Sequence, residues 1–257
     1  MNPEKRVRET LALKHVHSFV KRVKRLIEGI ELEDLLDKGG LNPYMIAALG
    51  INSIEEAVEL FVYRRVERSL GTSFGNVIEA FLRDVLGGKS GRDLDPNCKT
   101  RKRGAEKPWV CWWDIIIPRT HEKGGKRYKG IVISVKSGPA DINKDIVERF
   151  IQHAKEAEEY GYKPYLALTY GKQAFTVAKS TLRAWGLEPQ EYLLVGRDIF
   201  KEFLGDPDYY EHVIDLMKSA AEEIDIFDLM NKKIKELTGE LKRLYGNDII
   251  KLLKDLS

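Results

Sequence analysis

The sequence has few of the features that cross-link a protein or attach it to a membrane. It contains two cysteines, Cys98 and Cys111, and no Cys-x-x-Cys pair. This argues against a disulfide framework or a thiolate zinc site and favours reduced thiols. No apolar run approaches the roughly 18 residues that span a bilayer. Residues 1–24 also lack the apolar block of a secretory signal. We therefore expect a cytoplasmic protein with no membrane partner and no small-molecule cofactor.

Charged and hydrophobic residues are abundant instead. Hydrophobic residues make up 43% of the chain and charged residues 32%, enough for one large α/β domain with appended helices, or for two small domains. Lysine, arginine and glutamate are frequent and methionine is scarce, a bias typical of thermophile proteins. Residues 99–129 hold ten bases against three acids, a net charge of +7 in a chain of +3 overall. Such a region is typical of polyanion binding, although a solvated loop has the same composition.

Hydrophobic periodicity predicts three regions. Residues 1–70 form an N-terminal helical region, residues 71–205 an α/β core, and residues 206–257 a C-terminal helical region. In the core, a helix after Thr72-Ser73 precedes a central mixed β-sheet flanked by helices. The predicted strands are 109–117, 130–135, 164–169 and 192–195, and the predicted helices between them are 143–160 and 175–185.

The C-terminal region carries a regular apolar seam. Its members recur at steps of three and four along one helix, an a/d pattern: Phe227, Met230, Ile234, Leu237, Leu241 and Leu244. Two outcomes are open: the seam packs on the chain's own core, or it forms a dimer interface.

One acid and one lysine carry the chemistry. Asp114 lies inside the apolar run WWDIIIP, where a charge is costly without a partner or a metal. Lys136 closes the run IVISVK on the same face as Ser134, because strand side chains alternate. The two strands are close enough in sequence to be hairpin partners across residues 119–128. If they pair, Asp114 and Lys136 converge at the end of the sheet. A carboxylate holding a divalent cation beside a lysine suits phosphodiester hydrolysis.

Two helical glutamates complete the candidate set. Glu79 and Glu148 flank the apolar stripes of their helices. Each is either a surface residue in a salt bridge or a carboxylate that reaches over the sheet edge.

The order of these residues resembles the PD-(D/E)XK nuclease signature, with helical Glu79, strand Asp114, and then Ser134-Val135-Lys136. Ser134 stands in place of the second acid, as in a subset of type II restriction endonucleases that includes those cutting CCGG, CCNGG and CCWGG sites. In that subset the glutamate comes from the following helix, where Glu148 stands here. The stretches NPYMIAALG, SLGTSFGNVIE and ISVKSGPADINKD also look like segments of restriction-type proteins, and the resemblance spans residues 42–200. Ala140-Asp141-Ile142 replaces the guanine-reading Arg-acid-Arg run, so the target site does not carry over.

The resemblance implies a restriction-endonuclease-like core, in a homodimer that cuts double-stranded DNA at a specific sequence with Mg²⁺. Asp114, Glu148 and the Val135 carbonyl would hold the metal, and Glu79 would support them or hold a second metal. Lys136 would stabilise the attacking hydroxide. The predicted DNA contacts divide into phosphate-binding and base-reading residues: Arg64, Arg65, Arg68, Lys99, Arg101, Lys102, Arg103, Arg119, Lys126 and Arg127 for phosphates, and Asp141, Asn143 and Lys144 for base edges.

Three alternative functions are compatible with parts of this pattern. A junction resolvase or repair nuclease would share the fold but read DNA shape. A DNA-binding protein with a decayed site would bind without cutting. In an α/β protein unrelated to nucleic acids, the glutamates and Lys136 would be structural salt bridges.

Overall fold

The computed structural model describes residues 3–36, 40–99, 108–138 and 141–256. The chain divides into two compact units. The α/β unit contains residues 1–15 and 74–216, and the helical unit contains residues 16–73 and 217–257. Most of the N-terminal and C-terminal helical regions thus fold together in one unit. Within the described ranges, no helix is both long and apolar enough to cross a membrane.

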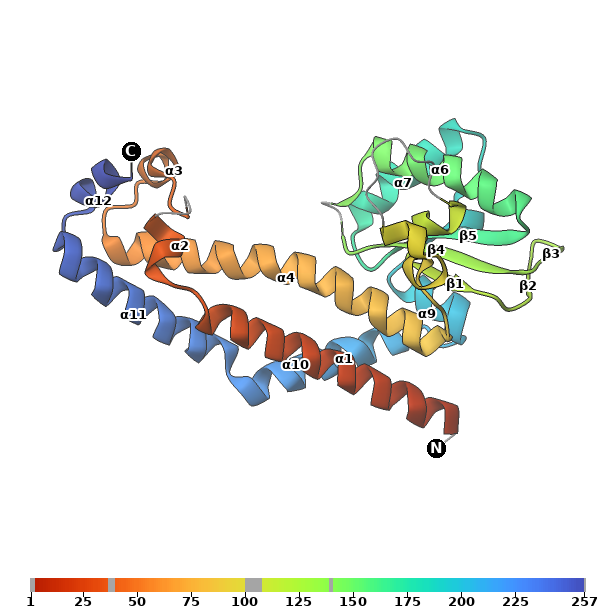
Figure 1. Ribbon diagram of the computed structural model, residues 1–257, viewed down its shortest axis with the longest axis horizontal. Helices are drawn as coiled ribbons and strands as arrows, with labels where there is room; N and C mark the ends of the chain where they lie inside the picture. The colour runs from red at the N-terminus through yellow and green to blue at the C-terminus, as the bar shows by residue number, and fades with distance from the viewer. Residues whose placement is uncertain (1–2, 37–39, 100–107, 139–140, 257) are drawn as a thin grey trace. The chain divides into compact units, whose positions relative to one another are not determined.

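The fold is mixed α/β (Figure 1). The helices are α1 (Pro3–Glu28), α2 (Leu32–Leu36), α3 (Pro43–Ala48), α4 (Ile54–Leu86), α5 (Gly91–Leu94), α6 (Lys144–Glu159), α7 (Lys172–Ala184), α8 (Pro189–Tyr192), α9 (Arg197–Leu204), α10 (Tyr209–Ile224), α11 (Ile226–Tyr245) and α12 (Ile249–Asp255). Two 3₁₀ helices are η1 (Pro96–Lys99) and η2 (Trp109–Trp112). The strands are β1 (Ile115–Ile117), β2 (His121–Lys123), β3 (Lys126–Tyr128), β4 (Gly130–Lys136), β5 (Tyr162–Leu168) and β6 (Leu193–Val195).

The main sheet is a small mixed sheet with the strand order β1-β4-β5-β6. β1 runs antiparallel to β4, with Ile115 opposite Ile133, whereas β4, β5 and β6 are parallel. β2 and β3 follow β1 in the chain and precede β4, and they form a separate two-stranded ribbon. The predicted mixed sheet, and the predicted pairing of the strands that precede and follow residues 119–128, are confirmed.

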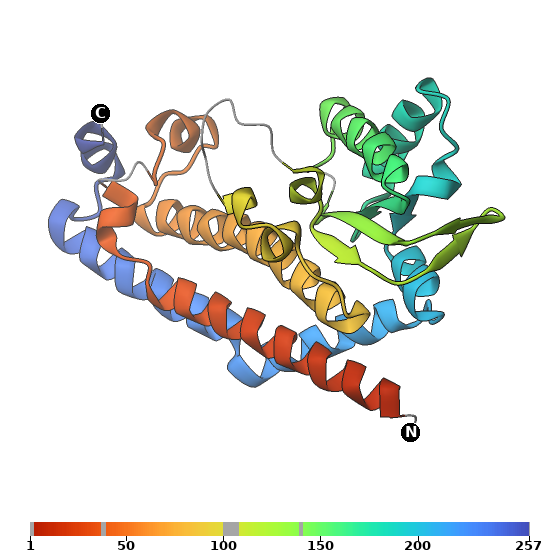
Figure 2. The same cartoon turned by 45° about the vertical axis from the view of Figure 1, so that its right-hand side comes forward.

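Helices cover both faces of this sheet. α6 and α7 lie over one face and α9 lies on the opposite side (Figures 1 and 2). The buried layer beneath α6 and α7 brings Val132 of β4 and Leu166 of β5 against Phe150 and Ile151 of α6. Most side chains of β4 and β5 are hydrophobic and buried, with Lys163 of β5 as a buried charged exception. This largely hydrophobic sequence follows from burial between two helical layers.

α4 differs from the sequence expectation. Separate helices were predicted before and after Gly71-Thr72-Ser73, but one continuous helix covers Ile54–Leu86. A glycine inside a helix costs only about 1 kcal/mol relative to alanine. Buried apolar residues occur in the helix both before Gly71 (Val58, Val62) and after it (Val77), and their burial outweighs the local preference for a break.

The run WVCWWDIII is not one strand. Trp109–Trp112 forms η2 and only Ile115–Ile117 is strand. Aromatic stacking accounts for the turn: Trp109 stacks on Tyr160 at 4.9 Å between ring centroids, and Trp112 stacks on His153 of α6 at 4.0 Å. A flat strand cannot place both rings against α6 and its end, so the chain winds before β1 begins.

The expectation of reduced thiols is wrong. Cys98 and Cys111 form a disulfide that ties η1 to η2. Sequence separation alone could not reveal that the two segments meet. Disulfides do occur in intracellular proteins of hyperthermophiles, so the bond agrees with the thermophile-like composition.

We expect this disulfide to stabilise the α/β unit. It closes a short loop, with a sequence separation of 13, and bonds of this kind contribute about 2–4 kcal/mol to the free energy of unfolding. A strong reductant, or the double variant Cys98→Ser/Cys111→Ser, should therefore lower Tm by about 5–10 °C. Calorimetry measures this shift, and the double variant should no longer respond to reductant. Equal Tm values for all samples would show that the bond contributes nothing.

The helical unit buries the C-terminal seam. Met230, Ile234, Leu237 and Leu241 of α11 join a core with residues of α1 and α4, while Phe227 is 70% exposed and Leu244 54% exposed. The seam therefore packs on the chain's own core, and its central residues are not available as a subunit interface.

Candidate active site

Asp114 and Lys136 meet at the end of β4. Oδ2 of Asp114 accepts a 2.7 Å hydrogen bond from the backbone N–H of Val135 and a 3.4 Å bond from the Ser134 hydroxyl. Nζ of Lys136 lies 3.8 Å from the same oxygen and donates to the Val135 carbonyl at 3.1 Å. Both charged side chains are partly exposed, 31% for Asp114 and 27% for Lys136. The site therefore joins opposite charges at an edge that a substrate can reach.

Backbone pairing on both sides holds Asp114 in place. Its N–H donates to the Ile133 carbonyl at 3.1 Å. The chain after α4 pairs with the same segment, because Lys89 and Ile116 exchange backbone hydrogen bonds at 2.7 and 2.9 Å. Gly88 allows this approach: a Cβ there would lie 2.6 Å from a side-chain carbon of Ile115. Asp114 is thus placed by the sheet and not by a mobile loop.

Glu79 reaches the site from α4. One turn earlier, a Cβ on Gly75 would lie 3.0 Å from Ser137, so this face of the helix packs closely against the end of β4. Glu79 pairs with Arg83 at 3.0 Å. Burial, followed by the negative charge of Asp114, raises the pKa of Glu79, although Arg83 and Lys136 act in the opposite direction. The two carboxylates repel each other, and a cation between them would relieve that repulsion.

This repulsion predicts a pH-dependent stability effect. The pKa of Glu79 in the folded chain lies above 4.5, so its ionised form is disfavoured by folding. Ionised Glu79 therefore lowers the free energy of unfolding at pH values above its folded pKa, and this loss disappears as the pH falls below 4.5. Glu79→Gln should therefore raise Tm by about 1–3 °C at pH 7–8 and leave it unchanged near pH 4. Thermal melts across this range test the sign, and a lower Tm at pH 7–8 would contradict it.

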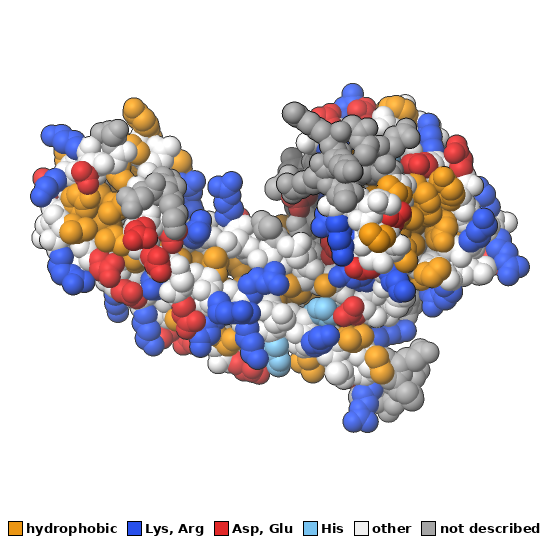
Figure 3. All heavy atoms as spheres, in the orientation of Figure 1, with side chains coloured by type: hydrophobic (Ala, Val, Ile, Leu, Met, Phe, Trp, Pro, Cys, Tyr) orange, Lys and Arg blue, Asp and Glu red, His pale blue; other side chains and the backbone are white. Residues whose placement is uncertain are grey.

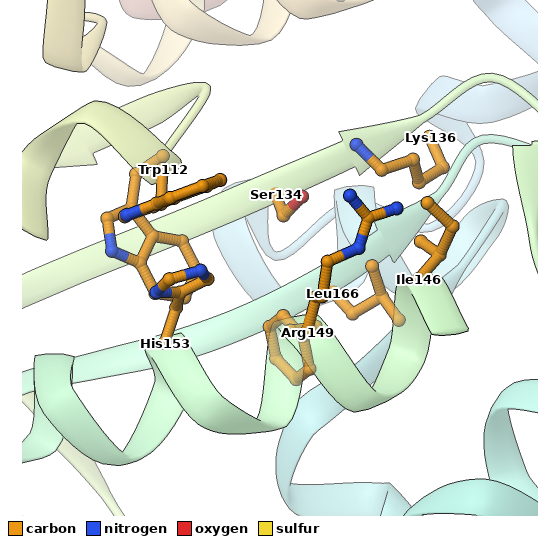
Figure 4. Close-up of a pocket in the computed structure, with 9 residues that line it drawn as sticks. Trp112, Ser134, Lys136, Ile146, Arg149, His153 and Leu166 are labelled. Carbon is orange, nitrogen blue, oxygen red and sulfur yellow. The ribbon is translucent and has the colours of Figure 1, made fainter. Parts of the chain in front are cut away.

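Glu148 lies in a different environment. Its carboxylate lies 3.7 Å from Lys144 Nζ and accepts a 3.4 Å bond from the indole N–H of Trp185. Lys144 lies on α6 and Trp185 lies just beyond α7. The next residue, Arg149, lines a pocket of about 200 Å³ together with Ser134 and Lys136. Figure 4 shows the Arg149 guanidinium extending toward both of them. The sequence prediction had placed a carboxylate there.

Mg²⁺ prefers oxygen ligands, and the carboxylates of Asp114 and Glu79 are the acidic groups described above beside Lys136. In the described part of the chain, no three His, Cys, Asp or Glu side chains gather as a metal-binding group. Magnesium, however, is commonly held by one or two carboxylates, with water and substrate phosphate as the other ligands. Asp114 and Glu79 fit that pattern, and Oδ1 of Asp114 takes part in none of the contacts given above. The Val135 carbonyl, a predicted ligand, accepts a hydrogen bond from Lys136.

The predicted DNA contacts fall in both units. Arg64 and Arg65 are in the helical unit and contact Met45 and Asp34, respectively, and Arg68 lies one turn further along α4. Lys99, Arg119, Lys126 and Arg127 are exposed on the α/β unit, where basic side chains are visible over the β2–β3 ribbon (Figure 3). Arg101, Lys102 and Arg103 lie outside the described residues.

The three predicted base-reading residues are already engaged. The Ser137 hydroxyl donates to Asp141. Oδ1 of Asn143 caps α6 by accepting from the Ile146 N–H at 2.9 Å. Lys144 pairs with Glu148.

Sequence reasoning identified Ser134 and Lys136 of this pocket but missed its other residues. Trp112 was assigned to a strand, and Arg149 was passed over for its neighbour Glu148. One signal was present: Ile146, Arg149, Phe150 and His153 recur at steps of three and four, which places them on one face of α6.

Comparison with known proteins finds no family model and no characterised relative that matches this chain.

Proposed function

We propose that this protein is a Mg²⁺-dependent DNA endonuclease with a restriction-endonuclease-like core, which cuts both strands of duplex DNA at a specific sequence. One observation carries the proposal. The Asp114 carboxylate is held by the Val135 N–H beside Lys136, with Glu79 close enough for its pKa to respond to both. An acid pair next to a lysine at a partly exposed sheet edge suits phosphodiester hydrolysis.

Each residue has a distinct task. Asp114 and Glu79 would hold the metal, which supplies positive charge against the phosphate and acidifies a bound water. Lys136 places a second positive charge beside Asp114 and offsets negative charge that develops on the attacking oxygen. The exposed lysines and arginines of residues 99–129 would hold the DNA backbone. Since the described part of each chain offers one such site, cutting two strands calls for a homodimer.

Digestion of a mixed-sequence plasmid with and without Mg²⁺, at elevated temperature, tests the function. Sequencing of the ends should give one short, symmetric sequence, and EDTA should stop the reaction. Cleavage confined to branched DNA would indicate a junction resolvase or repair nuclease instead. Tight binding without cleavage would indicate a decayed site. Sedimentation at micromolar concentration tests the dimer, and a monomer there would contradict it.

A further inference from the structure

Another pocket of the α/β unit is lined mainly by acidic side chains. It has a volume of about 320 Å³. Its lining residues come from α1 and from the start of α10 with the turn before it: Glu9, Asp206, Asp208, Tyr209 and His212. None of the three carboxylates has an ion-pair partner among the residues that the structure describes. Carboxylates around one cavity repel each other unless a cation lies between them.

Helix capping accounts for only part of this acidic cluster. Oδ1 of Asp206 accepts a 3.2 Å hydrogen bond from the Asp208 N–H just before α10 begins. Negative charge is favourable at the N-terminus of a helix, which suits both aspartates. Glu9 comes from α1, so the capping of α10 does not explain its place in the cluster.

Two buried polar atoms of the pocket have no partner. Tyr209 is only 3% exposed, and its hydroxyl makes no hydrogen bond to any described residue. The same holds for Nε2 of His212. Packing fixes the tyrosine ring: Phe81 stacks on it, 2° from parallel, and the ring of Phe200 lies 5.7 Å away. Because unpaired buried polar groups are costly, a ligand that supplies the missing partners would be favoured here.

The Tyr209 hydroxyl lies in the field of the carboxylates. Burial, followed by the negative charge of Glu9, raises the pKa of Tyr209 to about 12; Asp206 adds to this effect and Arg8 opposes it. The phenol therefore stays neutral near pH 7, and its oxygen can accept a hydrogen bond. Together with the carboxylates and the free nitrogen of His212, it makes the pocket rich in acceptors. This favours a ligand that is positively charged and carries N–H donors.

The spacing of the acceptors favours an organic cation over a metal ion. In the described ranges, no three His, Cys, Asp or Glu side chains gather closely enough to hold a metal. The pocket volume of about 320 Å³ lies instead at the lower end of small-molecule sites. An alkylammonium group has three N–H donors, and a diamine carries two such groups separated by a flexible chain. Its two charges can therefore reach acceptors that one ion cannot.

We propose that this pocket binds a linear aliphatic diamine in its doubly protonated form. One ammonium group would donate to the Tyr209 hydroxyl and the Glu9 carboxylate. The other would donate to the aspartates before α10, with Nε2 of His212 as a further acceptor. The bound diamine would link α1 to α10 within the α/β unit. This site shares no residue with the proposed nuclease site and does not depend on it.

Isothermal titration of the full chain with 1,4-diaminobutane tests the site. DNA is left out, because its phosphates attract cations. Binding should be saturable, with one diamine per chain. Butylamine, which has the same carbon chain but one charge, should bind at least about tenfold more weakly. An equal concentration of Mg²⁺ should not displace the diamine. Equal affinity for butylamine, or displacement by Mg²⁺, would contradict a diamine site.

Tyr209→Phe separates binding from folding. It removes only the unpartnered hydroxyl, so without diamine its Tm should be no lower than that of the wild type. Its affinity for 1,4-diaminobutane should fall about tenfold. Tyr210→Phe is the matched control, because this neighbouring tyrosine does not line the pocket, and it should bind normally. Glu9→Gln should also lower the affinity by about tenfold or more, and it decides the matter if Tyr209→Phe does not fold. A wild-type chain without saturable binding, or a folded pocket variant with full affinity, would overturn the proposal.

Discussion

Asp114→Ala should abolish DNA cleavage while leaving duplex binding intact or tighter. The Asp114 carboxylate is the group that lies between the Val135 N–H and Lys136, and in the proposed site it holds the metal. Removing one preorganised charged group from such a site costs about 100- to 1000-fold in rate. Binding should not suffer, because the lost negative charge had repelled the phosphate. Single-turnover cleavage and anisotropy measure the two effects.

Two further variants separate charge from folding. Asp114→Asn keeps an oxygen for the Val135 N–H and loses only the charge, so it should be as inactive as Asp114→Ala. Asp198→Ala removes an exposed carboxylate on α9 and should cut normally. If Asp114→Asn cuts at the wild-type rate, Asp114 is not a metal ligand and the active-site assignment fails.

Glu79→Gln should lower the cleavage rate by about 100-fold or more, whereas Glu148→Gln should lower it by less than about threefold. The pKa of Glu79 responds to Asp114 and Lys136, while Glu148 contacts Lys144 and Trp185. Single-turnover rates across a range of Mg²⁺ concentrations measure the difference, and excess metal should partly rescue Glu79→Gln if it is a ligand.

The two glutamates form a matched pair. Each is 29% exposed and each is bridged to a cation four residues away on its own helix. A difference in rate between the variants therefore reflects position and not exposure or a lost salt bridge. An inactive Glu148→Gln beside an active Glu79→Gln would restore the role that the Ser-x-Lys resemblance gives to Glu148, and would require α6 to turn when DNA binds.

The local sequence pattern was sufficient to predict much of the secondary structure of the α/β unit. The apolar run that ends at Lys136 has the length and the largely continuous hydrophobicity of a buried strand, and Pro118 stops the run before it. Their separation predicts an antiparallel pair, and the structure confirms it. The meeting of Asp114 and Lys136 follows from this pairing, because each residue's position along its strand determines which end and face it occupies.

Only tertiary structure decided the remaining features, because each depends on contacts between distant segments. Burial along α4 outweighs the local preference for a break at Gly71, and stacking on α6 turns Trp109–Trp112 away from strand geometry. The disulfide needs η1 beside η2, and the burial of the α11 seam needs α1 and α4 beside it. The rotation of α6 determines that Arg149, and not Glu148, lines the pocket with Lys136. A helical stripe predicts which side of a helix is buried, but a residue at the stripe's margin turns toward the sheet end or away from it according to how the packed helix is rotated about its axis.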